Sequence, residues 1–370
     1  MSGENPAPLV VVAAGGTGGH LFPAEALSAA LALRGITVDL ATDERATRYG
    51  ATFPARATHI IPSATLRTSD PLTYVTAPLA ILRGVLQAYD LLGRLKPAAV
   101  IGFGGYPTVP PVFAAYRHNI PTLIHEQNGV LGRANRLLAP FVRSIAISFP
   151  HVLDSRPRLA AKATRTGNPV RPAVVAASKI PYAAPATGPF RLVVFGGSQG
   201  ARVMADVVPA ALELLAVAVR ARLAVTQQVR AEDAARVKEI YARLSVAAEV
   251  EPFFADLPAR IAAGHLIVAR SGASTVAELA AIGRPGILVP LPHALDQDQT
   301  ANAAMLEKAG GAMRVDQSAF TPKWLAAEIA ILASEPKRLA AMAEAARLTG
   351  AVDAADRLAD LVMQVAGLKR

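Results

Sequence analysis

Hydrophobic residues form short continuous runs that alternate with longer helical stretches. The runs Leu9–Ala14 and Arg191–Phe195 are rich in β-branched residues, and each leads into a cluster of glycines and then into a stretch of helical character. Continuous apolar strands that alternate with helices are typical of parallel sheets covered by helices on both faces. The pattern therefore predicts an α/β protein built on parallel sheets.

The strand–glycine–helix plan occurs in both halves of the chain, which predicts two Rossmann-like domains. Between the halves, Pro181, Pro185, Gly188 and Pro189 are typical of a linker. The C-terminal region is helical and either caps the second domain or crosses back to the first. The expected division is a first domain at 1–177, a linker at 178–190, a second domain at 191–350 and a final helix at 351–370.

Composition limits the classes of protein. A chain of 370 residues exceeds one ordinary domain, and 52% hydrophobic with 18% charged residues excludes a disordered chain. There is no cysteine, which excludes disulfides, thiolate metal sites and cysteine nucleophiles.

The net charge of +10 is concentrated in the first half of the chain. Residues 1–177 hold 17 basic and 9 acidic residues, and residues 178–370 hold 21 and 19. Positive charge favours nucleic acid, an anionic membrane or phosphorylated substrates. Aromatic residues make up only 5% and no basic, aromatic-rich strand is present, which disfavours a nucleic-acid binder.

No export signal or membrane span is expected. The first apolar run enters a glycine loop instead of a cleavage site. The apolar stretches 71–92 and 203–225 contain charged residues, and neither supplies the ~20 uninterrupted apolar residues of a spanning helix. We expect a cytoplasmic protein and leave open contact with a membrane surface.

The glycine loops 15–19 and 196–200 are placed to bind an anion at the start of a helix. Neither loop supplies the lysine of a P-loop. The dinucleotide fingerprint fails because Leu21 stands where its third glycine belongs. Asp39 and Asp43 do stand where an adenine-ribose acid would be, so NAD binding is disfavoured but left open.

Polar side chains cluster in two segments of the second half. Ser271, Ser274 and Thr275 either cap a helix or donate to phosphate. Glu278 either binds the hydroxyls of a ribose or complements the helix dipole, which is the more common role. The polar segment 293–302 either binds sugar hydroxyls or is a solvated loop. Its two acids, Asp296 and Asp298, make too weak a ligand set to predict a metal site.

Histidines supply the candidates for acid–base chemistry. His125 next to Glu126 suggests a catalytic pair, although a lone histidine is more often structural, and Gly129 rules out the zinc spacing His-Glu-x-x-His. His20 stands where a glycine loop becomes a helix, and its usual pKa of ~6.5 lets it accept a proton near neutrality.

Taken together, the ordered motifs resemble the MurG family of peptidoglycan N-acetylglucosaminyltransferases. The motifs are Gly15–His20, Gly104–Pro107, His125–Asn128, Gly167–Arg171, Gly196–Ala201, Arg270–Glu278 and Gln299–Asn302. The resemblance implies a GT-B fold, in which two Rossmann-like domains face each other across a cleft. It also implies an inverting transfer of N-acetylglucosamine from UDP-GlcNAc to the C4 hydroxyl of lipid I, which gives lipid II.

The same resemblance implies roles for individual residues. His20 would be the general base, Phe254 would lie against uracil, and Glu278 would hold the ribose hydroxyls. Ser198 would surround the diphosphate together with 273–275, and Gln299 and Asn302 would bind the sugar. The expected donor-binding residues are Thr17, Gly18, Gly19, Asn128, Arg171, Ser198, Phe254, Ala273, Ser274, Thr275, Glu278, Gln299 and Asn302. Tyr106 and Asn128, with Thr17, Gly18 and Gly19, would frame the acceptor side.

Two features depart from the family pattern. The stretch Ser63–Asp70 lacks the glycines that relatives carry around a Leu-Arg pair, which leaves its acceptor-loop role in doubt, and Asp298 has no assigned role. No tightly bound cofactor is expected, and a divalent cation is not required by the sequence.

The leucine-rich stretch 78–92 has apolar residues at helical spacing, which most often indicates a core-facing stripe. The resemblance instead implies a membrane-contacting patch, flanked here by Arg83, Arg94 and Lys96. Residues 75–95 are therefore expected to dock the first domain on the cytoplasmic face of the inner membrane.

Two further enzyme classes remain as alternatives. A GT-B glycosyltransferase with a different lipid acceptor would keep the motifs of the second domain but lose those at 104–107 and 125–128, which are present. An NAD-dependent oxidoreductase is disfavoured by the failed fingerprint.

Overall fold

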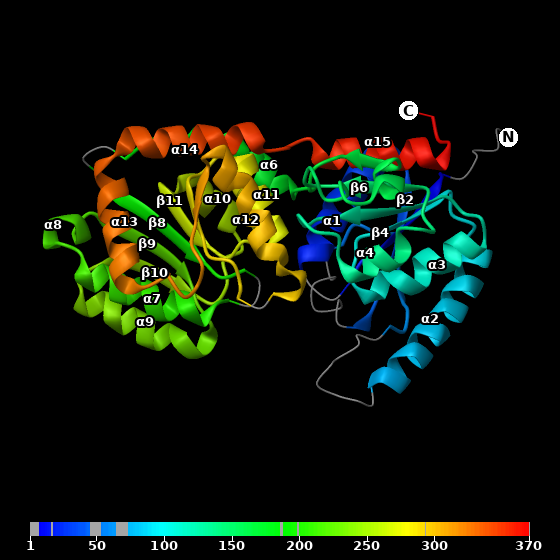
Figure 1. Cartoon of the computed structure of the whole chain (residues 1–370), viewed down its shortest axis with the longest axis horizontal. Helices are drawn as coiled ribbons and strands as arrows, with labels where there is room; N and C mark the ends of the chain where they lie inside the picture. The colour runs from blue at the N-terminus through cyan, green and yellow to red at the C-terminus, as the bar shows by residue number, and fades with distance from the viewer. Residues whose placement is uncertain are drawn as a thin grey trace. The chain divides into compact units, whose positions relative to one another are not determined.

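In the computed structural model, residues 7–15, 18–44, 53–63, 73–185, 188–197, 200–292 and 294–369 are described. The chain divides into two compact units. Unit 1 comprises Met1–Arg171 and Asp353–Arg370, and unit 2 comprises Pro172–Val352. Figure 1 shows that each unit consists of a central sheet with helices around it.

Unit 1 is built on a parallel sheet with the strand order β3-β2-β1-β4-β5-β6-β7. Its strands are β1 (Leu9–Ala13), β2 (Thr37–Thr42), β3 (Ala57–Ile60), β4 (Ala99–Gly102), β5 (Thr122–Glu126), β6 (Ser144–Ile147) and β7 (Ala163–Arg165). Its helices are α1 (Gly18–Ala32), α2 (Thr73–Leu95), α3 (Val109–Arg117), α4 (Arg133–Leu138), α5 (Pro157–Ala160) and α15 (Ala354–Ala366), with the 3₁₀ helix η2 (Tyr106–Thr108).

Helices cover both faces of this sheet. Val10 and Val12 of β1 lie in an apolar cluster with α1 and α15, whereas Val11 lies in a separate cluster with α2, α3 and α4. Successive side chains of a strand point to opposite faces, so a strand covered on both sides must be apolar throughout. This explains why β1 is a continuous hydrophobic run.

Unit 2 is built on a second parallel sheet, with the order β10-β9-β8-β11-β12-β13. Its strands are β8 (Phe190–Phe195), β9 (Leu223–Gln228), β10 (Ala247–Glu251), β11 (Leu266–Ala269), β12 (Gly286–Leu288) and β13 (Ala312–Arg314). Its helices are α6 (Pro172–Ser178), α7 (Arg202–Leu214), α8 (Val217–Arg220), α9 (Ala231–Arg243), α10 (Leu257–Ala263), α11 (Ala273–Ile282), α12 (Asp298–Ala309), α13 (Pro322–Ser334) and α14 (Pro336–Thr349), with the 3₁₀ helix η3 (Leu295–Gln297).

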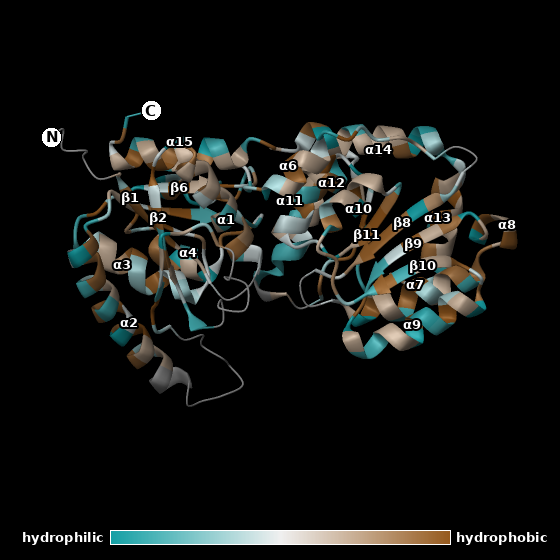
Figure 2. Ribbon diagram, turned by 180° about the vertical axis from the view of Figure 1, so that it is seen from behind, coloured by the Kyte–Doolittle hydropathy of each residue, from teal (hydrophilic) through white to brown (hydrophobic). Residues whose placement is uncertain are grey.

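The core of unit 2 repeats this two-sided arrangement. Leu192 and Val194 of β8 pack with α7, α9 and α13 on one face, and Val193 lies beside the end of α10 on the other. Figure 2 shows the central strand β11 as hydrophobic, and β8 is hydrophobic apart from the exposed Arg191. The predicted class, two α/β domains with parallel sheets, is confirmed.

The division of the chain differs from the expected boundary at residue 177. The contact-based division falls at Arg171, because α6 packs against α10 and α11 and so belongs to unit 2. The final helix, α15, packs against α1 and belongs to unit 1. Of the two arrangements considered for the C-terminal region, the structure shows the final helix packed on the first domain.

Both sheets reverse their strand order at a switch point. In unit 1 the reversal lies between β1 and β4, and in unit 2 between β8 and β11. Open α/β sheets bind ligands beyond the carboxyl ends of the strands at such points. The glycine loops 15–19 and 196–200 begin after β1 and β8, and the motifs Gly104–Pro107 and Arg270–Glu278 begin after β4 and β11, so each begins at a switch point.

Helix α2 buries a face of small residues instead of its leucines. Ala77, Ala88 and Leu92 are buried, whereas Leu79, Leu82 and Leu86 are 62%, 56% and 60% exposed. A Cβ at Gly84 would lie 2.0 Å from the carbonyl oxygen of Pro62, so only glycine allows this approach. The interpretation of the leucine stripe as core-facing is therefore wrong for these side chains.

Candidate functional site

The site in unit 1 is centred on His20, in the first turn of α1. Gly104 and Gly105 follow β4 with φ of 83° and 73°, in the left-handed region that favours glycine. A Cβ on either glycine would lie 3.4 Å from a carbon of the His20 ring. The loop after β4 therefore lies directly against the imidazole that follows the loop after β1.

A line of hydrogen bonds connects His20 to the interior. Nδ1 of His20 is 3.3 Å from Oε1 of Gln127, and Nε2 of Gln127 is 3.0 Å from Nδ1 of His125. Nε2 of His125 is in turn 3.0 Å from the carbonyl oxygen of Gly167. Gln127 and His125 are buried, while His20 is partly exposed. This line of hydrogen bonds therefore runs from the protein interior to the partly exposed imidazole of His20.

Burial keeps both imidazoles neutral near pH 7. It lowers the pKa of His125 to about 4, against the opposing effect of the bond to Gly167, and the nearby His20 lowers it further. Burial also lowers the pKa of His20, opposed by its contacts with Gln127 and with the backbone of Phe103. A neutral imidazole can accept a proton, so His20 suits the role of a general base.

The carboxyl group of Glu126 makes its hydrogen bonds to the loop after β5 and not to its neighbour His125. One carboxylate oxygen accepts from the backbone N–H and side-chain amide of Asn128, at 3.0 and 3.2 Å. The other accepts from the N–H of Gly132 and the amide of Asn135, at 2.9 and 2.8 Å. The carboxyl group thus holds the loop after β5. The interpretation of His125 and Glu126 as an acid–base pair finds no support in these contacts.

The other residues expected around His20 lie on the same loops. Tyr106 begins η2 directly after Gly105 and is partly exposed, and the amide of Asn128 is held by Glu126. Gly18 is buried and Gly19 is exposed at the start of α1. Thr17, also expected here, lies outside the described residues, as do residues 64–70 of the acceptor-loop stretch.

Arg171 lies beside the same helix. Its guanidinium carbon is 4.3 Å from the centre of the Phe22 ring. Burial raises the pKa of Glu25, and the charge of Arg171 opposes that rise. The structure thus brings Arg171 to α1 in unit 1, while its expected contact with a donor stays a prediction.

In unit 2, the start of α11 gathers hydroxyl groups at the switch point. Ser271 and Ala273 are buried, and the Oγ atoms of Ser271 and Ser274 are buried without a hydrogen-bond partner among the described residues. The N-cap position, Gly272, contributes no side-chain capping bond. Hydroxyls and N–H groups at a helix start are a suitable environment for a phosphate. Ser198, expected on the facing loop, lies outside the described residues.

The next two predicted residues lie further along this region. Thr275 and Glu278 are in the first two turns of α11 and are 9% and 6% exposed. A buried carboxylate in this position either binds a ligand hydroxyl or complements the helix dipole, as the sequence allowed.

Arg270 joins the loops after β11, β12 and β13. Its guanidinium donates to the carbonyls of Val289 and Pro290 at 3.1 and 3.0 Å and to Oε1 of Gln317 at 2.5 Å. Burial lowers its pKa. Arg270 thus fixes the loop geometry and was not predicted as a site residue on its own.

The polar segment after β12 forms the start of α12. Oε1 of Gln299 accepts from the N–H of Leu291 at 3.0 Å, and the amide of Asn302 donates to the carbonyl of Ser271 at 3.2 Å. Asn302 is therefore tied to the α11 loop. Burial raises the pKa of Asp298, and the N–H of Gln299 opposes the rise. Among the described residues, no group of three or more acidic or histidine side chains is placed to hold a metal ion.

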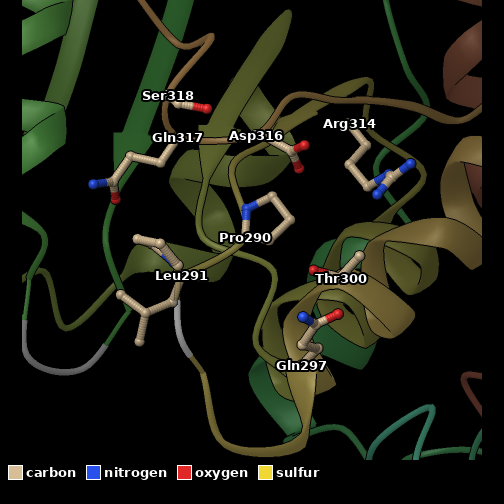
Figure 3. A pocket seen from close by; sticks show the side chains of 9 residues that line it. Pro290, Leu291, Gln297, Thr300, Arg314, Asp316, Gln317 and Ser318 are labelled. Carbon is tan, nitrogen blue, oxygen red and sulfur yellow. The ribbon is translucent and has the colours of Figure 1, made fainter.

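A hollow of about 610 Å³ opens beside these loops (Figure 3). Polar side chains from two segments, 297–300 and 314–318, line it, and apolar side chains of the β12 loop complete it. Its lining includes Pro290, Leu291, Gln297, Thr300, Arg314 and Gln317. Arg314 and Gln317 were missed by the sequence analysis. The signal that could have found them is their position directly at and after the end of β13, since site residues follow the carboxyl ends of such strands.

Phe254 is buried, and the guanidinium carbon of Arg260 lies 4.3 Å from the centre of its ring. Arg260 is held by bonds to Asp256 and Glu249. One face of the Phe254 ring is thus occupied by a fixed cation. Its expected contact with uracil stays a prediction.

The structure provides a different role for an acid considered for NAD binding. Asp39 is fully buried in β2 and accepts from Arg56 at 2.9 and 2.8 Å, with His59 at 2.9 Å. Burial alone would raise the pKa of Asp39, but the bonds from Arg56 and His59 outweigh it and lower the pKa. Asp39 is engaged in tying β2 to β3.

The strand order and the paired switch-point loops define a two-unit Rossmann-like protein of the GT-B class. Comparison with known proteins specifies the family. The Glycosyltransferase family 28 N-terminal domain matches residues 10–147, and the Glycosyltransferase family 28 C-terminal domain matches residues 191–358. The chain belongs to glycosyltransferase family 28.

Full-length relatives agree with this assignment. A protein of Rhodopseudomonas palustris (strain BisB18) is 61% identical over 363 residues, which cover 98% of this chain and 97% of the relative. A protein of Bradyrhizobium sp. (strain BTAi1) is 59% identical, with coverage of 98% and 99%. Both are named UDP-N-acetylglucosamine–N-acetylmuramyl-(pentapeptide) pyrophosphoryl-undecaprenol N-acetylglucosamine transferase. The resemblance to the MurG family is confirmed.

Solved structures support the fold. The crystal structure of Acinetobacter baumannii MurG is 29% identical, has a TM-score of 0.79 and covers 96% of this chain and 99% of its own. A UDP-GlcNAc 2-epimerase from Neisseria meningitidis, bound to UDP-GlcNAc, is 16% identical with a TM-score of 0.68 and coverage of 96% and 100%. The second likeness concerns the fold alone.

Proposed function

We propose that this chain transfers N-acetylglucosamine from UDP-GlcNAc to the C4 hydroxyl of the N-acetylmuramyl group of lipid I, forming lipid II. The observation that carries the proposal is the 61% identity, over 98% of the chain, to a transferase named for this donor and acceptor. The structure supports it with a neutral, partly exposed imidazole at the switch point of unit 1 and a hydroxyl-lined helix start at the switch point of unit 2.

The chemistry is one inverting displacement. Nε2 of His20 removes the proton of the acceptor hydroxyl as its oxygen bonds to C1 of the sugar. The bond between C1 and the diphosphate oxygen breaks, and UDP leaves with the bonding electron pair. The direct in-line attack accounts for a change from an α-linked donor to a β-linked product.

Unit 2 supplies the donor site in this proposal. The start of α11, with Ser271 and Ser274, stabilises the charge that develops on UDP. Glu278 holds the ribose, and Gln299 and Asn302 bind the sugar. The proposal requires no tightly bound cofactor and no divalent cation, so UDP release should persist after chelation with EDTA.

The decisive assay measures UDP release with a water-soluble lipid I analogue. We expect release with UDP-GlcNAc and much less with UDP-GalNAc or UDP-glucose. Release with another lipid-linked sugar and none with the lipid I analogue would favour the alternative, a GT-B transferase with a different acceptor. Release only with another nucleotide sugar would contradict the donor assignment.

Two variants separate binding from chemistry. Glu278→Ala should raise the KM for UDP-GlcNAc, because the ribose contacts are lost in the ground state and the transition state alike. The exposed Glu344→Ala in α14 is the matched control and should leave this KM unchanged. His20→Ala should lower kcat by about 10²–10⁴, the usual contribution of a general base. Unchanged turnover would exclude His20 as the base.

The chain is also proposed to bind the cytoplasmic face of the inner membrane through unit 1. Leu79, Leu82, Leu86 and Tyr89 form one exposed face of α2, here called the α2 apolar face, and Arg83 and Arg94 are exposed near it. A helix with such a face lies in the plane of a membrane surface, and anionic lipid strengthens its binding. Among the described residues, no helix combines the length and the apolar character needed to cross a bilayer.

Vesicle flotation tests this surface. Leu82→Asp combined with Leu86→Asp should abolish flotation with anionic vesicles, whereas Leu348→Asp, a similarly exposed leucine in unit 2, should not. Flotation should weaken with added salt. Equal binding to neutral and anionic vesicles, insensitive to salt, would contradict the electrostatic contribution.

A further inference from the structure

Two backbone carbonyls fix the direction of the hydrogen bonds around His125. A carbonyl oxygen can only accept, so the carbonyl of Gly167, 3.0 Å from Nε2 of His125, requires a proton on that nitrogen. The hydroxyl of Ser148, 3.5 Å from the same atom, is able to accept as well. Because His125 is neutral, its Nδ1 carries the lone pair and accepts from Gln127.

The orientation of the Gln127 amide follows independently from a second carbonyl. The carbonyl of His125 is 3.1 Å from Nε2 of Gln127, and only the NH₂ group can donate to it. The same NH₂ group reaches Nδ1 of His125. Both contacts place the amide nitrogen toward β5 and the amide oxygen toward His20. The hydrogen-bond partners therefore fix which end of the Gln127 amide is the nitrogen and which is the oxygen.

The amide oxygen determines which nitrogen of His20 carries the proton. Oε1 of Gln127 is 3.3 Å from Nδ1 of His20 and can only accept, so it favours the tautomer with the proton on Nδ1. In the tautomer protonated at Nδ1, the lone pair is on Nε2.

We infer that Gln127, anchored by His125, is a positioning residue that holds His20 in the tautomer whose Nε2 accepts the proton of the substrate hydroxyl. This inference rests on the proposed role of His20 as the base. A buried acid plays the corresponding part in serine protease triads, where it holds the catalytic imidazole in the correct tautomer. Here a neutral amide does so, and its own direction is set by a second, buried histidine.

The tautomer can be measured without any turnover. In protein labelled with ¹⁵N-histidine, the two ring nitrogens of a neutral imidazole have distinct chemical shifts, and the His20→Gln variant identifies the signals of His20. We expect the proton on Nδ1 of His20 in the wild type. In Gln127→Met, which removes the acceptor at similar side-chain length, we expect the population protonated at Nε2 to rise. The same tautomer population in both proteins would overturn the inference.

Kinetics give the second readout. Gln127→Met should lower kcat about 10- to 100-fold, less than the full contribution of a general base, and should leave the KM for UDP-GlcNAc within about twofold. Gln364→Met, the same substitution at an exposed position of α15, is the matched control.

The outcomes separate the inference from the proposed function. A tautomer change in Gln127→Met without loss of kcat would overturn the catalytic role of Gln127. A fall in kcat with an unchanged tautomer would also overturn it and assign Gln127 a merely structural role. Failure of the proposed function would instead appear as no UDP release by the wild type, and the NMR result would stand unaffected.

Discussion

Replacing Glu126 by glutamine tests whether this buried carboxyl group is structural or catalytic. The substitution keeps the size of the side chain and replaces one acceptor oxygen by an NH₂ group. The carboxylate accepts from two donors of Asn128 at one oxygen and from Gly132 and Asn135 at the other. Whichever way the amide turns, it satisfies one pair of donors and opposes the other pair.

The expected cost follows from these contacts. A buried donor left without its partner costs about 1–3 kcal/mol, so two donors cost about 2–6 kcal/mol before the loop relaxes. Relaxation of the loop brings this to about 2–4 kcal/mol. Since about 1.4 kcal/mol corresponds to a factor of ten, local opening of the loop should become about 30- to 1000-fold more frequent.

Hydrogen exchange of the segment 126–136 is the suitable assay, because a chain with two units need not unfold in a single step. We expect faster exchange in this segment in Glu126→Gln and no change at β8 or β9 in unit 2. Asp154→Asn is the matched control, since Asp154 is exposed and its carboxylate pairs with His151 across one turn. Unchanged exchange together with a hundredfold fall in kcat would refute the structural role and restore Glu126 as an acid or base.

Three other predictions follow from the contacts described. Arg284 is 1% exposed and donates to the carbonyls of Ala262, Ile282 and Ile180. Thermal unfolding should therefore show that Arg284→Met destabilises unit 2 by about 3–5 kcal/mol, and that Arg284→Lys recovers only part of this loss. Gly84→Ala should loosen α2 and speed hydrogen exchange along it, because its Cβ would meet the carbonyl of Pro62. Since the base must be neutral and burial lowers the pKa of His20, kcat/KM should fall on the acid side with a midpoint below 6.5, and a midpoint above 6.5 would contradict this.

The fold could be predicted from sequence because its signals are local. The β-branched runs, the glycines that follow them and the helical stretches identify β1 and β8 and the loops after them within about 20 residues of chain. Gly15 and Gly196, the first glycines of the two loops, were therefore placed correctly beyond the ends of β1 and β8. The boundary near residue 177 was displaced because α6 follows a motif of unit 1 but packs on unit 2.

The packing of α2 could not be predicted from hydrophobicity. Leucines at helical spacing most often face a core, and the stripe from Leu79 to Tyr89 fits that pattern. The helix instead buries Ala77, Gly84 and Ala88, because the approach to Pro62 leaves no room for larger side chains. Small residues carry little hydrophobic signal, so the buried face is visible only in the structure.

The part of the site that sequence reasoning missed depends on contacts between distant segments. His20 and Gln127 are 107 positions apart, and Gly167 is 42 positions from His125. Each residue type alone was ambiguous, since a lone histidine is most often structural and glutamine is an ordinary loop residue. Their chemistry follows from the carbonyls that fix each donor, and carbonyl directions are not readable from side-chain sequence.

The distribution of charge gives the two units different means of holding anions. With α15 included, unit 1 carries 20 basic and 12 acidic residues, whereas unit 2 carries 18 and 16. The arginine nearest the start of α11, Arg270, is engaged by the carbonyls of Val289 and Pro290 and by Gln317. In the proposed function, unit 2 would therefore hold the diphosphate through hydroxyl groups and the helix start, whose interactions are directional and short-ranged. The electrostatic attraction from the excess charge of unit 1 extends over a Debye length, about 8 Å at physiological salt. Attraction over this range suits an extended anionic surface better than the recognition of one small molecule.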